Sequence, residues 1–307
     1  MRQSCERLPW VDSLKGVGIL LVILGHSAIP DSVYQMIYRF HMPLFFFLSG
    51  FLFRGEFSWQ WARRKINRLL VPYFLYGLLY IIVIRAVKGF SLTEMTCDLL
   101  SLSGIGVLWF LPCLFLAEIL GAYAIAKCRA ERTRILIALT VAFAGWVFPQ
   151  VWVGRLLVAT AFYLAGNWWR SVRHQFRMNV VKYGLSVLLM AGLIWNQRVD
   201  MANAIFGNFF LFYGPALGVP VFLISVFEDF SISVPALDFI GARSLEFMAL
   251  HQLVPILVRW LAAFLGIEPH WILLKALIFA LLAVACWGVH RYIPVLSGKG
   301  LHLFVRK

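Results

Sequence analysis

Residues 10–26 read WVDSLKGVGILLVILGH, an apolar stretch that carries an acid, a lysine and a histidine. Its length approaches the roughly 20 residues that a helix needs to cross a bilayer. The whole chain has the same character, because 62% of its 307 residues are hydrophobic and 14% are charged, with a mean hydropathy of +0.82. A soluble domain carries roughly 25% charged residues, so a soluble globular enzyme is excluded. The sequence predicts an all-α, polytopic integral membrane helix bundle.

Apolar segments separated by charged residues or by Pro and Gly mark the predicted membrane helices. Lipid offers the backbone no hydrogen-bond partner, so segments of this length cross as helices. We predict about ten spans in a single integral membrane domain over residues 1–307. Their cores are 11–29, 36–53, 69–87, 107–126, 135–152, 156–169, 180–196, 204–227, 239–264 and 271–290. The sixth core is short, the ninth is long, and the connection 85–106 is predicted to form a re-entrant or interfacial element.

The positions of Lys and Arg predict the orientation. The chain has 28 Lys and Arg against 14 Asp and Glu, a net charge of +14, which in a soluble protein would indicate a nucleic-acid partner. Multi-spanning proteins instead collect Lys and Arg in their cytoplasmic loops. With the N-terminus inside, most of these residues fall in cytoplasmic connections, although the connection before 239–264 is acidic. Both termini are therefore predicted to be cytoplasmic, with membrane lipid and not nucleic acid as surroundings.

The cysteines and histidines show no metal-binding pattern. The five Cys have neither CxxC nor His-paired zinc spacing, so neither a metal site nor a disulfide framework is predicted. We also expect no permanently bound cofactor.

Ionisable residues inside a span are functional candidates, since each costs roughly +2.5 to +3.5 kcal/mol at a helix centre. Lys15 and His26 are eleven residues apart, which returns them to within about 20° of one helix face and separates them by about 16 Å along the axis. Asp12 is one turn before Lys15, a spacing suited to an ion pair. The pattern predicts a base in a dry pocket with a cation at its cytoplasmic mouth. The alternatives are a helix-packing histidine and a snorkelling lysine.

Two further buried ionisable residues could join this group. His41 enters its span at nearly the depth at which His26 leaves, so the two imidazoles could meet, or His41 could simply cap a Pro-initiated helix. Glu118, within 107–126, could orient a histidine, neutralise Lys15 or serve only in packing.

A basic segment follows the second predicted span. It contains Arg63, Arg64, Lys65 and Arg68 at the start of a helix. Such a run is commonly a topology signal with affinity for anionic lipids. The alternative is phosphate binding, for which Arg forks, Lys charges and helix N-termini are suited.

Five segments, in order over residues 8 to 255, resemble the membrane acyltransferase-3 family, and its fucose 4-O-acetylase-like branch most closely. They are the first helix with Asp12, Lys15 and His26; HMPLFFFLSG at 41–50; the basic segment ending RLLVPY at 68–73; LWFLPCLF at 108–115; and IGARSLEFMALH at 240–251. In the first helix the family has an arginine, ten residues and a histidine. This chain has Lys15 instead, which keeps the charge and the spacing but loses the bidentate fork.

The resemblance implies ten membrane helices, acetyl-CoA as acyl donor and co-substrate, and a hydroxyl of a cell-surface glycan or its lipid-linked precursor as acceptor. It implies a multi-pass protein of the bacterial cytoplasmic (inner) membrane. Carried over by position, His26 matches the essential histidine, Lys15 the first-helix arginine, and Arg63, Arg64 and Arg68 the cytoplasmic basic segment.

These expectations combine into a hypothesis of O-acetyl transfer. The phosphates of acetyl-CoA would bind the basic segment near Lys15, and His26 would act as general base or, alternatively, as a nucleophile. Ser49 and Trp109 are candidate oxyanion donors, and His251 is a candidate pocket residue. A carrier or flippase for a glycan or other anionic substrate explains the charge equally well, and a scaffolding protein predicts that the buried charges are dispensable.

One further pair is assigned to structure. Arg243 and Glu246 are one turn apart and are predicted to form an ion pair with each other.

Overall fold

The structure is a computed structural model in which residues 8–89, 91–148, 150–175, 179–267 and 270–299 are described. Within these ranges it is helical, with no strand beyond an isolated bridge between Asp200 and Ile205. The elements are α1 (Pro9–Gly25), α2 (Asp31–Tyr38), α3 (His41–Leu52), α4 (Trp59–Lys65), the π-helical turn η1 (Ile66–Leu70), α5 (Val71–Lys88), α6 (Leu92–Leu100), η2 (Gly106–Trp109), α7 (Phe110–Lys127), α8 (Glu131–Val147), α9 (Val151–Val172), η3 (Arg173–Gln175), α10 (Asn179–Leu189), α11 (Gly192–Trp195), η4 (Met201–Asn203), α12 (Phe209–Asp229), α13 (Pro235–Gly241), α14 (Ser244–Leu250), α15 (Leu253–Phe264) and α16 (Trp271–Tyr292). The predicted all-α fold class is confirmed.

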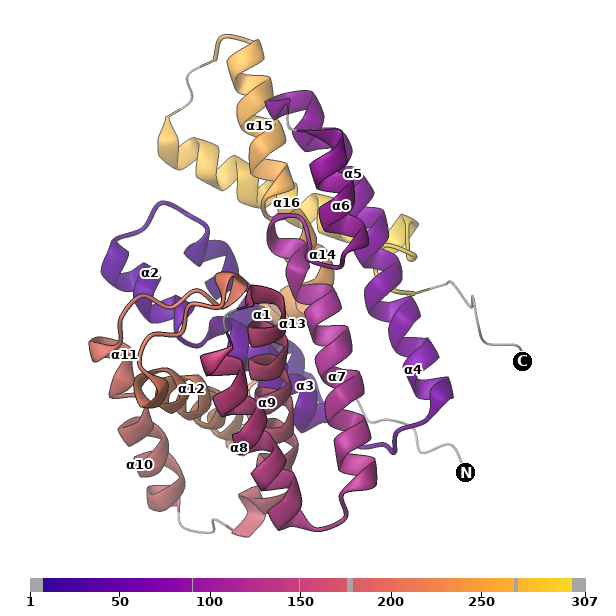
Figure 1. The fold of residues 1–307 in the computed structure, drawn as a ribbon. Coiled ribbons are helices and arrows are strands. Elements are labelled where there is room, and N and C mark those ends of the chain that lie inside the picture. The colour runs from indigo at the N-terminus through magenta and orange to yellow at the C-terminus, as the bar shows by residue number, and fades with distance from the viewer. Residues whose placement is uncertain (1–7, 90, 149, 176–178, 268–269, 300–307) are drawn as a thin grey trace.

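A close crossing of α3 and α9 lies at the centre of the lower bundle, where α7 and α8 run beside α9 (Figure 1). Gly50 of α3 faces the main-chain carbonyl of Tyr163, and Gly166 of α9 faces that of Phe47. A Cβ atom at either glycine would overlap the facing carbonyl. Small residues allow membrane helices to approach this closely, so the crossing fixes α3, which forms one wall of the site.

A second glycine crossing holds α1 against α13. Gly16 faces the carbonyl of Leu237, and Gly241 faces the carbonyl of Asp12. Because α3, α12 and α14 also contact α1, this helix runs through the interior of the molecule. The side chains on one face of α1 line cavities.

The structure contains fewer membrane-length helices than the predicted spans. Four described helical runs are long and apolar enough to cross a bilayer, and α14 with α15, bent by 40°, makes a fifth candidate. The four runs are Trp59–Val87, Gly106–Lys127, Phe209–Asp229 and Ile272–Tyr292. Every predicted core overlaps at least one helix, but the number ten stays a prediction. So does the cytoplasmic position of the termini, since residues 1–7 and 300–307 lie outside the described ranges.

Several predicted boundaries are wrong. The first helix ends at Gly25, and core 36–53 is divided at Phe40 into α2 and α3, with Pro43 in the first turn of α3, where its missing N–H is tolerated. The short core 156–169 is the 22-residue α9. Core 180–196 is divided into α10 and α11, and core 239–264 into α13, α14 and α15.

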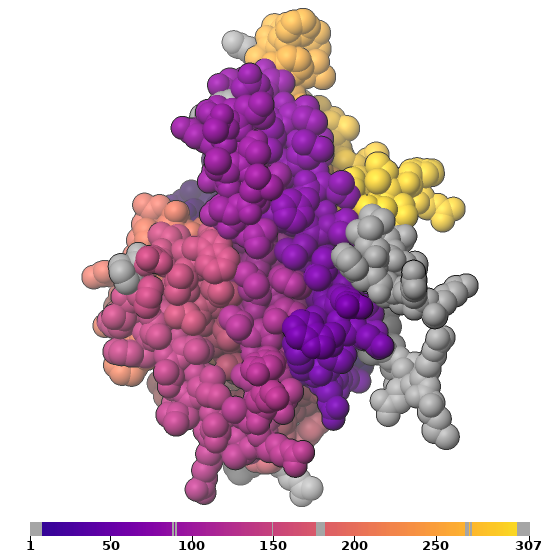
Figure 2. Space-filling view, turned by 45° about the vertical axis from the view of Figure 1, so that its right-hand side comes forward, coloured from indigo at the N-terminus to yellow at the C-terminus, as the bar shows by residue number. Residues whose placement is uncertain are grey.

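The connection 85–106 contains a helix, α6, that packs back on α5. Leu99 of α6 contacts the position where a Cβ atom would stand on Gly77. Figure 2 shows α5 and α6 in the upper part of the molecule, with the end of α15 above them. Apolar side chains are exposed there, including Leu78 at 54%, Ile82 at 58% and Phe264 at 75%. Such a surface is the one expected where lipid replaces water.

Candidate active site

One stripe of α1 lines two spaces in succession. Lys15, Ile19 and Val22 line an inner cavity of about 340 Å³, and Val22 and His26 line an outer pocket of about 190 Å³. Spacings of four, three and four residues keep these side chains on one helix face. Lys15 and His26 therefore open onto neighbouring spaces, about 16 Å apart along the axis.

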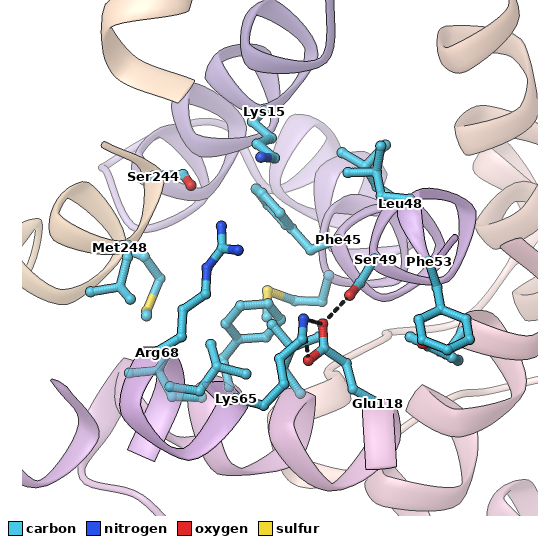
Figure 3. A pocket seen from close by; sticks show the side chains of 18 of the residues that line it. Lys15, Phe45, Leu48, Ser49, Phe53, Lys65, Arg68, Glu118, Ser244 and Met248 are labelled. Carbon is cyan, nitrogen blue, oxygen red and sulfur yellow. Dashed lines mark hydrogen bonds and ion pairs between the residues drawn. The ribbon is translucent and has the colours of Figure 1, made fainter. Parts of the chain in front are cut away.

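Three basic side chains from separate helical elements face the inner cavity. Figure 3 shows Lys15 of α1, Lys65 of α4 and Arg68 of η1 pointing into it. Lys65 and Arg68 share a helix face because they are three residues apart. Arg63 and Arg64 are exposed and line none of the three spaces found among the described residues. The segment predicted as one phosphate-binding unit is thus divided between cavity and surface.

Glu118 contacts Lys65 and Ser49, not Lys15 or a histidine. The Lys65 Nζ atom lies 2.8 Å from each carboxylate oxygen of Glu118, and the Ser49 hydroxyl donates to Oε1. The predicted partners of Glu118 are therefore wrong. The reason is tertiary, since α7 places this carboxylate opposite α4 and α3 (Figure 3). Ser49, a predicted oxyanion donor, lines the inner cavity, where its hydroxyl donates a hydrogen bond to Glu118.

A mouth cavity of about 610 Å³ adjoins the inner cavity and shares Lys15 and Arg68 with it. Arg54 lines both spaces as well, and Lys299 lines the mouth cavity. Asp12 stands at the wall with its Oδ1 atom 3.8 Å from the Lys15 Nζ atom. The predicted pair of the first helix thus lies where two charged cavities meet.

Glu246 pairs with the C-terminal part of the chain, and the predicted Arg243–Glu246 pair is wrong. Its Oε1 atom lies 2.6 Å from His290 Nδ1 and accepts a 2.6 Å hydrogen bond from the Ser297 hydroxyl. Arg243 instead donates to the carbonyl of Phe239 at 3.0 Å and lies over its ring. The helix breaks between α13 and α14 at Arg243, so the spacing of a continuous helix does not apply.

The outer pocket gathers His26, Tyr38 and His41. His26 is the residue that follows the end of α1 and is exposed, so it lies less deeply in the protein than predicted. The shortened helix is the reason, because α1 ends at Gly25. The Tyr38 ring lies near both imidazoles, 6.1 Å from the His26 ring centroid and 4.8 Å from that of His41.

Two buried histidines have their tautomers set by main-chain carbonyls. His41 Nδ1 donates to the carbonyl of Ile37 at 2.8 Å, and His251 Nδ1 donates to that of Met248 at 2.8 Å. In the neutral ring the other nitrogen is then an acceptor. The Nε2 atom of His251 is buried without a partner among the described residues, and the His251 ring lies 5.1 Å from that of His26. His251, a predicted pocket residue, thus contacts His26 but does not itself line the outer pocket.

The side chain of Gln252 contacts His26 directly. Its amide nitrogen lies 3.4 Å from His26 Nδ1, and Gln252 also lines the outer pocket. The amide therefore selects which imidazole nitrogen carries the proton.

Sequence reasoning missed two residues at the outer pocket, one in its lining and one that contacts a lining residue. Asp200 lines the pocket and accepts a hydrogen bond from the Asn203 side chain at 2.8 Å. Arg155 donates to the carbonyls of Ser103 and Ala202, and its guanidinium lies 5.2 Å from the ring of Trp109, itself a wall residue. The sequence signal for Asp200 and Arg155 was weak, because each is a single charged residue in a connection that was predicted to be short.

Among the described residues, no cluster of His, Cys, Asp or Glu has the number and proximity to hold a metal ion.

Comparison with known proteins assigns the chain to a family. A family profile described as an acyltransferase domain, of the acyltransferase-3 kind, matches residues 8–291. The chain belongs to the acyltransferase-3 family. This acyltransferase-3 domain therefore fills nearly the whole chain, and its described residues include four or five helical runs able to cross a membrane.

One curated relative of this acyltransferase-3 chain is nodulation protein NolL of Mesorhizobium japonicum. It is 34% identical over an alignment of 128 positions, and the alignment covers 36% of this chain and 34% of the relative. The match thus covers about a third of that protein. No solved structure matches the chain.

Proposed function

We propose that the protein is a membrane O-acyltransferase that moves an acetyl group from cytoplasmic acetyl-CoA to a hydroxyl of a cell-surface glycan or its lipid-linked precursor. The observation that supports it is the α1 stripe, which carries Lys15 at a charged cavity and His26 at a separate pocket. Family membership supports acyl transfer. The donor, the acceptor and the bacterial inner membrane are parts of this proposal.

The donor end is assigned to the inner and mouth cavities. Acetyl-CoA carries phosphates, which Arg and Lys side chains bind well. Arg54, Arg68 and Lys15 line both cavities, and Lys65 adds a charge that Glu118 partly neutralises. Arg68 supplies the bidentate group that Lys15 lacks. Arg63 and Arg64, which face away, are assigned to lipid headgroups and topology.

The reaction is assigned to the outer pocket, with His26 as general base. The acceptor hydroxyl gives its proton to the imidazole as its oxygen bonds to the acetyl carbon. The tetrahedral intermediate then expels the CoA thiolate, which takes the proton from the imidazolium and leaves as the thiol. Trp109 is the wall residue retained as a candidate donor to the oxyanion.

Gln252 and His41 are assigned supporting roles. The Gln252 amide nitrogen faces His26 Nδ1, which is the acceptor in this arrangement. A flip of the amide would present its carbonyl oxygen to Nδ1 instead, hold the imidazole N–H there and leave Nε2 as the basic nitrogen. His41 Nε2, the free acceptor of its ring, and Asp200 offer acceptors for sugar hydroxyls.

The test is transfer from radiolabelled acetyl-CoA by purified protein in lipid nanodiscs, measured as labelled acceptor and as slow hydrolysis. We expect His26→Ala to lower the rate by 10²-fold or more. The matched control is His174→Ala, which removes an exposed histidine of η3. Full activity of His26→Ala in protein that melts like the wild type would overturn the assignment. Glycan flux into liposomes without acetyl transfer would favour a carrier.

A further inference from the structure

The inner cavity and the outer pocket share part of their walls. Four residues line both spaces, namely Val22, Met42, Phe110 and Met248. They come from α1, α3, α7 and α14. Residues that line two adjoining spaces stand between them, so these four side chains form an apolar collar, the collar hereafter.

The collar separates two chemically different spaces. The inner side holds Lys15, Lys65 and Arg68, whereas the outer side holds His26 and Asp200. Moving phosphates through an apolar ring would cost far more than moving an uncharged thioester and its acyl group. The collar therefore lets the acyl thioester end of an acyl-CoA pass and keeps the phosphate-bearing end in the inner cavity.

Two of the collar residues are rigid and two can adapt. Phe110 packs against the rings of Phe45 and Phe46, with centroids 5.9 and 5.1 Å apart, and Val22 is β-branched and 4% exposed. Met42 and Met248 have unbranched side chains that change rotamer readily and fill irregular space. The width of the passage is thus set by the two methionines.

Resting on the proposed function, we propose that the collar is the acyl-selectivity filter of this protein, and that Met42 and Met248 set the length of acyl chain transferred to the acceptor. An acetyl group passes beside both methionines to His26. A longer chain needs the space that their Sδ and Cε atoms occupy, or else fills the outer pocket of about 190 Å³ where the acceptor binds.

The test compares acetyl-CoA with butyryl-CoA and hexanoyl-CoA in nanodiscs. We expect the wild type to prefer acetyl-CoA, and Met42→Ala and Met248→Ala each to raise the butyryl-to-acetyl ratio of kcat/KM by about tenfold, since one methylene in an apolar pocket is worth 10-fold or more. The matched control is Met36→Ala, which removes a 45% exposed methionine of α2. Its ratio should equal that of the wild type.

An unchanged ratio in both collar variants, with wild-type acetyl transfer, overturns the inference and leaves the proposed function standing. If the wild type uses no acyl-CoA at all, it is the proposed function that fails.

A second variant tests the passage itself. Val22→Phe narrows the collar but leaves the phosphate-binding cations in place. The affinity of the variant for acetyl-CoA in a filter-binding assay should therefore stay within about threefold of the wild type, while the rate of transfer falls by about 10²-fold. Equal transfer by folded Val22→Phe protein would contradict a passage at this point. The matched control is Val33→Phe, which adds the same ring at a 38% exposed valine of α2 and should retain transfer.

Discussion

Removing the charge of Glu118 should both loosen the fold and change donor affinity. The carboxylate is 4% exposed and the Lys65 side chain is 21% exposed, with 2.8 Å between the Lys65 Nζ atom and each oxygen. At this distance the attraction is about 6 kcal/mol for an effective dielectric constant of 20. Desolvation of both groups offsets much of it. We therefore expect a coupling free energy of about 2 to 3 kcal/mol.

The measurement is a double-mutant cycle with Lys65→Met, Glu118→Gln and the double variant, read as unfolding in detergent. Glu118→Gln keeps an acceptor for Ser49, so the cycle isolates the charge pair. The matched control is the Arg198–Asp200 pair, which is 4.0 Å apart with Arg198 63% exposed and should couple by less than about 1 kcal/mol. A coupling below about 0.5 kcal/mol for Lys65 and Glu118 would refute the buried pair.

The same variants carry a kinetic readout. In Glu118→Gln the Lys65 ammonium loses its partner and faces the inner cavity with its full charge, so the KM for acetyl-CoA should fall by a fewfold. In Lys65→Met it should rise by about tenfold, the value of one charge-assisted hydrogen bond. Equal KM values in both variants would remove Lys65 from the donor site, whatever the stability data show.

Three further changes have distinct expected results. Arg68→Met should raise the KM for acetyl-CoA about tenfold, whereas Arg63→Met should leave it unchanged; equal effects would contradict the division of the basic segment. Gly50→Leu should destabilise the α3–α9 crossing by more than about 3 kcal/mol or prevent accumulation, while Gly288→Leu, with open space around it, should melt like the wild type. Gln252→Leu should lower kcat by about tenfold with an unchanged KM for acetyl-CoA; a rise in that KM with normal kcat would place Gln252 in the donor site instead.

The sequence alone was enough to predict the fold class, the shared face of Lys15 and His26, and the family. Apolar segments of about 20 residues favoured the all-α class, since a backbone in lipid must satisfy its hydrogen bonds internally and a helix does so within one segment. The 3.6-residue period required Lys15 and His26 to share a stripe, and the stripe lines both spaces. The family followed from short motifs in order along the chain.

Contacts between residues far apart in the chain became known only from the tertiary structure. Glu118 could have faced Lys15, a histidine or Lys65, and only the packing of α7 against η1 and α3 placed it beside Lys65. Asp200, in the connection between α11 and α12, lines the same pocket as His26 although the two are far apart in the chain. Periodicity gives the direction of a side chain from its own helix axis and contains nothing about which helix stands opposite. Helix pairing depends on close fits such as Gly50 against Tyr163, which exist only once the chain has folded.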